Sequence, residues 1–222
     1  MIDKRVASLS DAVAGIADGS TVCIGGFGDS GSPLALIAAL IEQGARDLTV
    51  VSNNAGSGRG SGIASLLAAG RVRKIVCSFP RSEGSVVFEE LYEAGKIELE
   101  LVPQGTLSER MRAAAAGLAG FYTPTAAGTL LAEGKEQREF DGRTYVLERP
   151  IVADIALIAA ERADRWGNLV YHSAARNFGP VMASCGKLSI VQTHEIVELG
   201  SIDPEIVVTP GIFVDRVVKV AR

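Results

Sequence analysis

Short runs of apolar residues alternate, over the first half of the chain, with segments whose apolar positions recur at helical spacing. The short runs predict buried strands at residues 20–27, 47–54, 74–79 and 97–103. The helical segments lie around and between them, at residues 4–18, 34–43, 61–69, 84–94 and 110–120. Strands and helices that alternate in this way are typical of βαβ units. We therefore predict an α/β fold with an open, mainly parallel sheet covered by helices on both faces.

Residues that favour helix ends support several of these boundaries. Ser32 followed by Pro33 predicts an N-cap with proline at the first helical position, and Gly44 ends the same helix. Thr106 and Glu109 form a T-x-x-E capping box in front of the helix at 110–120.

The second half of the chain departs from this alternation. Residues 138–148 predict a β-hairpin with Asp141-Gly142 in its turn. Further strands are expected across residues 154–172, which turn at Trp166-Gly167-Asn168, and at 187–193 and 212–218, with a short helix at 175–184. No linker divides the sequence. We predict one domain over residues 1–222, with the hairpin as an excursion from it.

Composition and charge narrow the classes of function. Hydrophobic residues make up 47% of the 222 residues and aromatic residues 5%, as expected for helices packed on a buried parallel sheet. The net charge of −4 and the scattered basic residues argue against a nucleic-acid partner. No apolar stretch approaches the roughly 20 residues of a membrane helix. Asp3, Asp11 and Asp18 interrupt any signal-peptide core, so a cytoplasmic location without membrane contact is expected.

Cysteine and histidine do not form a recognisable metal or redox pattern. Cys23, Cys77 and Cys185 are odd in number, far apart and outside any CxxC motif, so we expect free buried thiols. His172 and His194 are the only histidines and lie in no ligand pattern, so we expect no metal.

Polar segments follow each of the predicted parallel strands. They read GGFGDSG, SNNAGSG, SFPRSEG and PQGT. Because ligands collect at the carboxyl ends of the strands in open α/β sheets, these segments together predict a site built from amides and backbone N–H groups.

A dinucleotide site is one interpretation of the first segment. Gly26, Gly28 and Gly31 match G-x-G-x-x-G between a strand and a helix. The pattern also needs an acidic residue at the end of the second strand, where this chain has SNN, and Asp47 lies at the opposite end. We count a nicotinamide-dependent oxidoreductase as a minority alternative. A sugar-phosphate isomerase or a ligand-sensing domain is a third, although no carboxylate is convincingly placed as an isomerase base.

Glu83, in RSEGS, is a second candidate for chemistry. A glutamate in such a loop can act as a nucleophile or a general base. We favour the simpler interpretation that it stabilises the N-terminus of the next helix.

The motifs together resemble a known family. DGSTVCIGGFGDSGSP (residues 18–33) is similar to the first signature of the family I coenzyme A transferases, with Cys23 where an aliphatic residue or Phe is usual. Further segments resemble the A (α-type) chain of that family in order: LTVVSNNAG, ELVPQGTLSERMRAAAAG, FYTPT, GTLLAEGKE, ADRWGNLVY, ARNFGP and TPGIFVDRVV. The resemblance covers nearly the whole chain.

The resemblance implies half of a two-subunit enzyme. In that family the covalent glutamate belongs to the B subunit, in a Ser-Glu-Asn-Gly context that this chain lacks. We therefore expect the chain to be inactive by itself and to act in a heterodimer or an A2B2 assembly. Coenzyme A is then a substrate, and no permanently bound cofactor is expected.

The loop at 77–81, CSFPR, resembles the 3-oxoadipate CoA-transferases of aromatic catabolism. Succinyl-CoA:acetoacetate enzymes usually carry a Ser-Tyr-Val-Gly-Glu-Asn type segment there. The resemblance thus implies succinyl-CoA as donor and 3-oxoadipate as acceptor, with acetoacetate as the alternative.

The resemblance also suggests roles for individual residues. Asn54 and Gln104 are expected to stabilise oxyanions or support substrate, the alternative being that they only tie loops together. Arg81, and after it Arg176, are candidates for the distal substrate carboxylate, although each is also consistent with an ordinary surface arginine. The residues expected at coenzyme A are Gly25, Gly26, Phe27, Gly28, Asp29, Ser30 and Gly31. Phe27 alternatively packs into the core.

Overall fold

A central β-sheet organises the chain in the computed structural model, which describes residues 2–56, 60, 62–81 and 84–221. Within these residues the sheet has eight strands. Seven of them, from one edge to the other, are β11 (Arg216–Lys219), β10 (Gly186–Val197), β8 (Ala153–Asp164), β1 (Thr21–Ile24), β2 (Leu48–Asn54), β3 (Val72–Phe79) and β4 (Glu98–Leu101). These neighbours pair in parallel, and β9 (Leu169–Val170) pairs antiparallel with β8. The direction in which the chain adds strands to the sheet changes at β1. Strands β2, β3 and β4 follow on one side of β1, and β8, β10 and β11 follow on the other.

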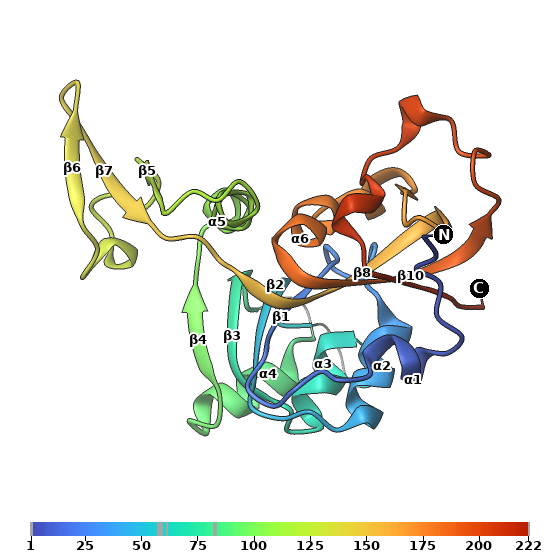
Figure 1. Cartoon of the computed structure of the whole chain (residues 1–222). Helices are drawn as coiled ribbons and strands as arrows, with labels where there is room; N and C mark the ends of the chain where they lie inside the picture. The colour runs from blue at the N-terminus through green and yellow to red at the C-terminus, as the bar shows by residue number, and fades with distance from the viewer. Residues whose placement is uncertain (1, 57–59, 61, 82–83, 222) are drawn as a thin grey trace.

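Helices cover both faces of this sheet (Figure 1). One face carries α1 (Leu9–Val13), α2 (Leu34–Gln43), α3 (Gly62–Ala68) and α4 (Val86–Glu93). The other face carries α5 (Gln104–Ala115) and α6 (Gly179–Cys185). The predicted α/β architecture with a mainly parallel sheet is confirmed. None of the helices in the described part of the chain is long and apolar enough to cross a membrane.

The two helical layers bury different sides of the same strands. Successive side chains of a strand point to opposite faces. In β1, Val22 and Ile24 accordingly pack in the core below α1–α4, whereas Cys23 packs in the core below α5 and α6. Val50 and Val51 divide in the same way in β2. This double burial explains why the strands read as continuous apolar runs.

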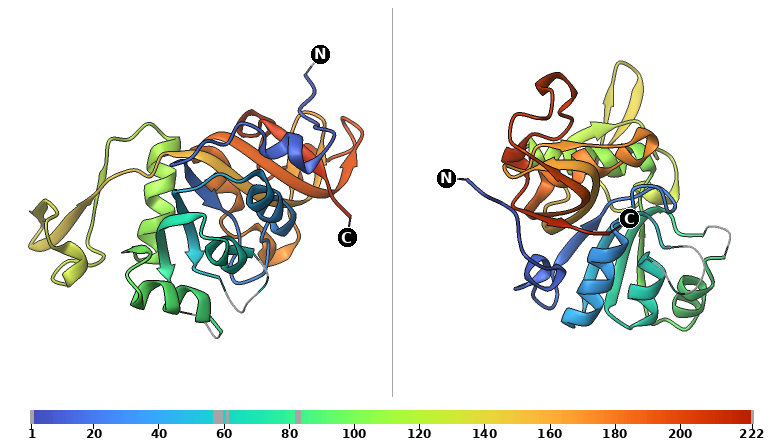
Figure 2. Two further views of the ribbon diagram at one scale, coloured as in Figure 1. Left: turned by 90° about the horizontal axis from the view of Figure 1, so that it is seen from below. Right: turned by 90° about the vertical axis from the view of Figure 1, so that its right-hand side faces the viewer.

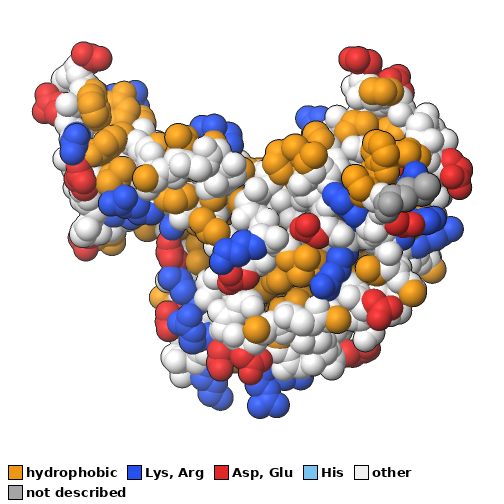
Figure 3. Space-filling model, in the orientation of Figure 1, with side chains coloured by type: hydrophobic (Ala, Val, Ile, Leu, Met, Phe, Trp, Pro, Cys, Tyr) orange, Lys and Arg blue, Asp and Glu red, His pale blue; other side chains and the backbone are white. Residues whose placement is uncertain are grey.

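A small lobe (residues 121–148) projects from the body (Figure 1). It consists of β5 (Phe121–Thr123), β6 (Gln137–Phe140) and β7 (Arg143–Glu148), which form a separate antiparallel sheet. Asp141 and Gly142 both have positive φ, 48° and 72°, as a two-residue hairpin turn requires. The predicted hairpin excursion is confirmed, and a hollow lies between the lobe and the part of the molecule at the upper right of the view (Figure 3).

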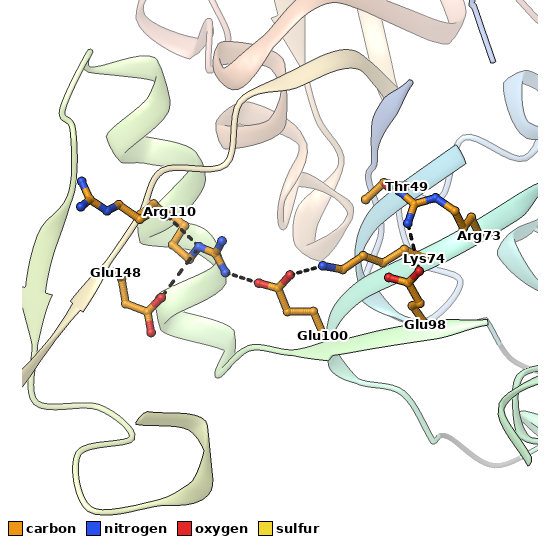
Figure 4. Close-up of polar contacts among 8 residues, drawn as sticks. Thr49, Arg73, Lys74, Glu98, Glu100, Arg110 and Glu148 are labelled. Atoms are coloured by element: carbon orange, nitrogen blue, oxygen red, sulfur yellow. Dashed lines mark hydrogen bonds and ion pairs between the residues drawn. The ribbon is translucent and has the colours of Figure 1, made fainter. Parts of the chain in front are cut away.

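A chain of ion pairs connects the lobe to the β4 edge of the sheet (Figure 4). The carboxylate of Glu100, on β4, accepts hydrogen bonds from Lys74 at 2.6 Å and from Arg110 at 2.8 Å. Glu148, on β7, pairs with Lys135 at 2.6 Å and with Arg110 at 3.9 Å. Arg110, from α5, therefore stands between the sheet and the lobe.

The first helix and the last strand are shorter than the sequence pattern predicts. The predicted helix at 4–18 is reduced to α1, because the backbone of Val6 donates to Val217 and that of Val217 donates to Lys4. This pairing ties the N-terminal segment to β11, so that both termini lie at one edge of the sheet (Figure 2). The predicted strand at 212–218 begins only at Arg216, since Gly211–Phe213 form a 3-10 turn.

Two predicted helix starts are also wrong. Pro33, and not the predicted Ser32, is the N-cap of α2. α5 begins at Gln104, so that Thr106 lies inside the helix and is buried rather than capping it. In both cases a proline stands just before the first helical residue, because the fixed φ of Pro33 and Pro103 suits that position.

Candidate active site

The loop after β1 and the carboxyl ends of β2 and β3 meet the beginning of α5 around one cavity. Its volume is about 450 Å³. The residues that line it are Phe27, Gly28, Asn53, Asn54, Ser78, Phe79 and Gln104. The structure thus brings together four residues that the sequence singled out from three separate segments.

A second cavity, of about 360 Å³, shares Phe27 and Gln104 with the first. It continues toward α5 and α6, where it is lined by Gly105, Ser108, Asn177 and Phe178. We call the two together the cleft. Phe27 is 53% exposed, so the alternative that it packs into the core is wrong.

Asn53 connects three sides of the cleft and was not predicted from the sequence. Its Oδ1 accepts hydrogen bonds from the Ser78 hydroxyl at 2.9 Å and from Gln104 Nε2 at 2.7 Å. Asn53 is only 5% exposed, and these bonds hold Gln104 and the end of β3 against the end of β2. The signal in the sequence is the pair of asparagines at a strand end, of which the prediction includes only Asn54.

Asn54 is a lining residue of the cleft. Its Oδ1 accepts a hydrogen bond from the backbone N–H of Gly56 at 2.8 Å, which fixes the side chain. The Nδ2 group has no hydrogen-bond partner among the described residues, although Asn54 is only 8% exposed. A fixed donor at a cavity wall is suited to an oxygen that gains negative charge.

The glycine turn (residues 25–31) contributes Phe27 and Gly28 to the lining of the cleft. The N–H of Phe27 donates to the carbonyl of Ser30 at 3.0 Å, and the N–H of Ser30 returns a bond at 3.3 Å, so Gly28 and Asp29 form the tip. Gly28 has a φ of +59° and open space where a side chain would stand. A ligand can therefore approach the backbone closely at this point.

Neither candidate arginine lines the cleft. Arg81 is 65% exposed at its side chain and pairs with Glu89 at 3.5 Å and Glu93 at 4.0 Å, both on α4. Arg176 is exposed, at the end of a 3-10 turn (Ser173–Arg176), and makes no ion pair with the described residues. Glu83 lies outside the described residues.

The cysteine thiols are structural. Cys23, Cys77 and Cys185 are buried and free, as predicted, with 3.7 Å between the sulfurs of Cys23 and Cys185. Hydrogen bonding to Cys185, together with burial, raises the pKa of Cys23, and burial raises the pKa of Cys77 to about 12. Both thiols are protonated near neutral pH, and neither can serve as a nucleophile.

The cleft therefore offers amides, hydroxyls and backbone groups, and among the described residues no charged side chain lines it. Nor do the described residues include a cluster of three His, Cys, Asp or Glu side chains suited to a metal. Such a site can bind and stabilise negative charge.

Similarity to known proteins identifies the family. A family model described as coenzyme A transferase matches residues 6–220. The chain belongs to the coenzyme A transferase family. Membership in this family sets aside the dinucleotide and isomerase interpretations. It agrees with the paired asparagines at the end of β2, where a dinucleotide site needs an acidic residue.

Relatives in this family are named as A subunits. The chain is 62% identical to the A chain of 3-oxoadipate CoA-transferase from Pseudomonas putida, over all of this chain and 95% of the relative. It is 52% identical to the A chain of succinyl-CoA:3-ketoacid coenzyme A transferase from Xanthomonas campestris pv. campestris (strain B100), over 97% of this chain and 88% of the relative. The chain is therefore the A-type half of a CoA-transferase.

Solved CoA-transferases share the fold. An acyl-CoA transferase from Escherichia coli O157:H7, in a thioester complex with CoA, superimposes with a TM-score of 0.84 at 27% identity. The match covers 99% of this chain but 47% of that one, so the chain spans about half of the E. coli enzyme. Glutaconate coenzyme A-transferase from Acidaminococcus fermentans gives a TM-score of 0.87 at 23% identity, which shows the fold alone.

Proposed function

We propose that this chain, together with a partner B subunit, transfers CoA from succinyl-CoA to 3-oxoadipate. The observation that carries the proposal is a cleft rich in fixed neutral donors and without a carboxylate or other charged side chain among its described lining residues. The name of the 62% identical relative supports 3-oxoadipate as the acceptor. The missing nucleophile is a glutamate of the B subunit, and the enzyme is a cytoplasmic heterodimer or A2B2 assembly.

The reaction proceeds through anhydride and thioester steps at the partner's glutamate. Its carboxylate attacks the thioester carbonyl of succinyl-CoA, and the C–S bond breaks to give a glutamyl–succinyl anhydride and CoA thiolate. The thiolate then attacks the glutamyl carbonyl, which releases succinate and leaves a glutamyl-CoA thioester. The carboxylate of 3-oxoadipate attacks this thioester, and the same steps in reverse give 3-oxoadipyl-CoA and regenerate the glutamate.

Each attack creates a tetrahedral intermediate with a negatively charged oxygen. The Nδ2 group of Asn54 and the Nε2 group of Gln104 are the donors we assign to this oxygen. Asn54 is held by Gly56 and Gln104 by Asn53, so neither donor has to reorganise as charge develops.

The glycine turn is assigned to coenzyme A. Gly28 leaves room for a ligand beside the main chain, and Phe27 offers an apolar face to both arms of the cleft. These features suit the pantetheine arm, whose binding supplies energy for positioning the thioester. CoA enters and leaves as a substrate.

The distal carboxylate of the acceptor requires a cation. Arg176 is the better of the two candidates in this chain, because its guanidinium makes no ion pair with the described residues, whereas Arg81 is held by two glutamates. Acetoacetate, which has no second carboxylate, is the competing acceptor and is consistent with the relative named for 3-ketoacids.

Reconstitution tests the proposal. Each of the two chains by itself, and the assembled enzyme, are incubated with succinyl-CoA and either acceptor, and the CoA thioesters are separated by liquid chromatography. We expect transfer only in the assembled enzyme, with a higher kcat/KM for 3-oxoadipate than for acetoacetate. Mass spectrometry should find CoA bound covalently only to the B chain. Transfer by the present chain without its partner, or a CoA adduct on it, overturns the assignment.

A further inference from the structure

One side chain from a distant part of the sequence holds both ends of the glycine turn. Asn177 follows the 3-10 turn at Ser173–Arg176 and lies more than a hundred residues from the turn in sequence. We propose that Asn177 is a positioning residue, which fixes the glycine turn at the geometry needed to bind the CoA thioester. The part of this inference that concerns CoA binding rests on the proposed function.

The amide of Asn177 uses both of its ends. Oδ1 accepts hydrogen bonds from the backbone N–H of Gly26 at 3.2 Å and of Phe178 at 2.7 Å. Nδ2 donates to the carbonyl oxygens of Ser30 at 2.9 Å and Ala174 at 3.0 Å. Gly26 precedes the tip of the turn and Ser30 follows it. A single planar group therefore sets the distance between the two ends.

Close packing at Gly31 shows that this contact is tight. A Cβ atom at Gly31 would clash with the carbonyl oxygen of Ala175 and would stand 3.0 Å from Asn177 Nδ2. Glycine is also suited to the φ of +73° at this residue. The backbone of the turn thus lies directly against the segment that carries Asn177.

The location of the turn makes this contact relevant to binding. Phe27 and Gly28, which line the cleft, stand between the two bonded residues Gly26 and Ser30. Without the amide, the stretch from Gly26 to Ser30 would lose its bonds to the segment that carries Asn177 and would keep only the bonds between Phe27 and Ser30. Displacements of about 1 Å in a positioned group can lower a rate by up to about 10²-fold.

The chain offers a matched control. Asn168 also joins two segments through both ends of its amide, since Oδ1 accepts from the N–H of Gly211 at 2.9 Å and Nδ2 donates to Asp164 at 2.8 Å. It does not line either arm of the cleft. Asn168→Ala therefore removes a comparable structural contact without touching the glycine turn.

A conservative variant separates the two halves of the contact. Asn177→Asp keeps an oxygen that can accept from Gly26 and Phe178. It replaces the Nδ2 donor with a second oxygen, which repels the carbonyls of Ser30 and Ala174. We expect Asn177→Asp to impair the turn at its Ser30 end, and Asn177→Ala to impair it at both ends.

Hydrogen exchange of the full-length chain tests the contact independently of activity. In Asn177→Ala, the N–H of Gly26 loses its acceptor and the carbonyl of Ser30 loses its donor. Amides of a peptide covering residues 25–32 should therefore exchange at least about tenfold faster. The same peptide in Asn168→Ala should exchange as in the wild type. Unchanged exchange in Asn177→Ala overturns the inference, even if the wild-type enzyme transfers CoA as proposed.

Kinetics of the assembled enzyme test the consequence. For Asn177→Ala we expect kcat/KM to fall by about 10- to 100-fold with succinyl-CoA. The fall should be less than about threefold with the succinyl thioester of N-acetylcysteamine, which lacks the remote part of CoA. Equal losses with both thioesters, or the same pattern in Asn168→Ala, would show a merely structural role. Absence of transfer in the wild type would instead refute the proposed function and leave the exchange result standing.

Discussion

At the scale of single residues, the cleft depends on side-chain amides whose oxygen and nitrogen have different roles. Asn54, which lines the cleft, uses its oxygen to hold the backbone of Gly56, and its nitrogen makes no hydrogen bond with the described residues. Asn53 uses its oxygen to hold Ser78 and Gln104. The orientation of each donor is thus set by bonds within the chain, before any substrate binds.

Asn54→Asp separates these two uses. The aspartate can still accept the hydrogen bond from Gly56, but it replaces the donor with an oxygen that repels an oxyanion. We expect kcat of the assembled enzyme to fall by about 10²- to 10³-fold. Steady-state kinetics should show this while the circular dichroism spectrum stays unchanged. A kcat within about threefold of the wild type would remove Asn54 from the oxyanion site.

At the scale of secondary-structure elements, β3, β4, α5 and the lobe are joined through charged side chains. Burial disfavours the charge of Glu100, but hydrogen bonds from Arg110 and Lys74 outweigh it, and the pKa of Glu100 is lowered from 4.5. The folded chain therefore holds this proton less tightly than the unfolded chain. The resulting stabilisation is present above about pH 4.5 and is lost as the pH falls through the folded-state pKa.

Glu100→Gln tests this pH dependence. At neutral pH we expect the variant to have a lower free energy of unfolding than the wild type, because Arg110 and Lys74 lose their common partner. The difference should shrink as the pH is lowered below about 4.5, where the wild-type carboxyl also becomes neutral. Urea denaturation of the purified chain, from neutral pH to about one unit below the ordinary glutamate pKa, measures it. A difference that stays constant over this range would contradict the assignment.

The sequence predicts which helices and strands exist better than it predicts the residues at which they begin and end. Apolar periodicity located the parallel strands and the helices between them, and Asp141-Gly142 located the hairpin. The pattern at 4–18 is helical throughout, yet backbone pairing of Val6 with Val217 takes the first residues away from the helix. Periodicity describes only local preference, and that pairing partner lies at the far end of the chain.

At the scale of the whole molecule, one sheet contributes side chains to two hydrophobic cores, one on each face. Leu40, on α2, is fully buried against one face, and Met111, on α5, is fully buried in the core on the other face. Since the same strands contribute side chains to both cores, neither helical layer can separate without exposing the sheet. The body should therefore unfold as one unit.

Leu40→Ala and Met111→Ala test this coupling. Each substitution leaves a cavity and should lower the free energy of unfolding by about 2–5 kcal/mol. Because the cores share the sheet, both should shift one common transition, followed by far-ultraviolet circular dichroism and by fluorescence of Trp166. Two separated transitions in either variant would show that the layers unfold independently.

The sequence by itself determined the fold class, the family resemblance and most segments of the cleft, because these follow from local periodicity and from motifs contiguous in the chain. The tertiary structure decided which side chains of those segments meet. It brought Gln104 to Asn53 and Asn177 to the glycine turn, and it turned Arg81 toward the glutamates of α4. Such contacts join residues far apart in sequence, and their geometry depends on how the strands are ordered in the sheet.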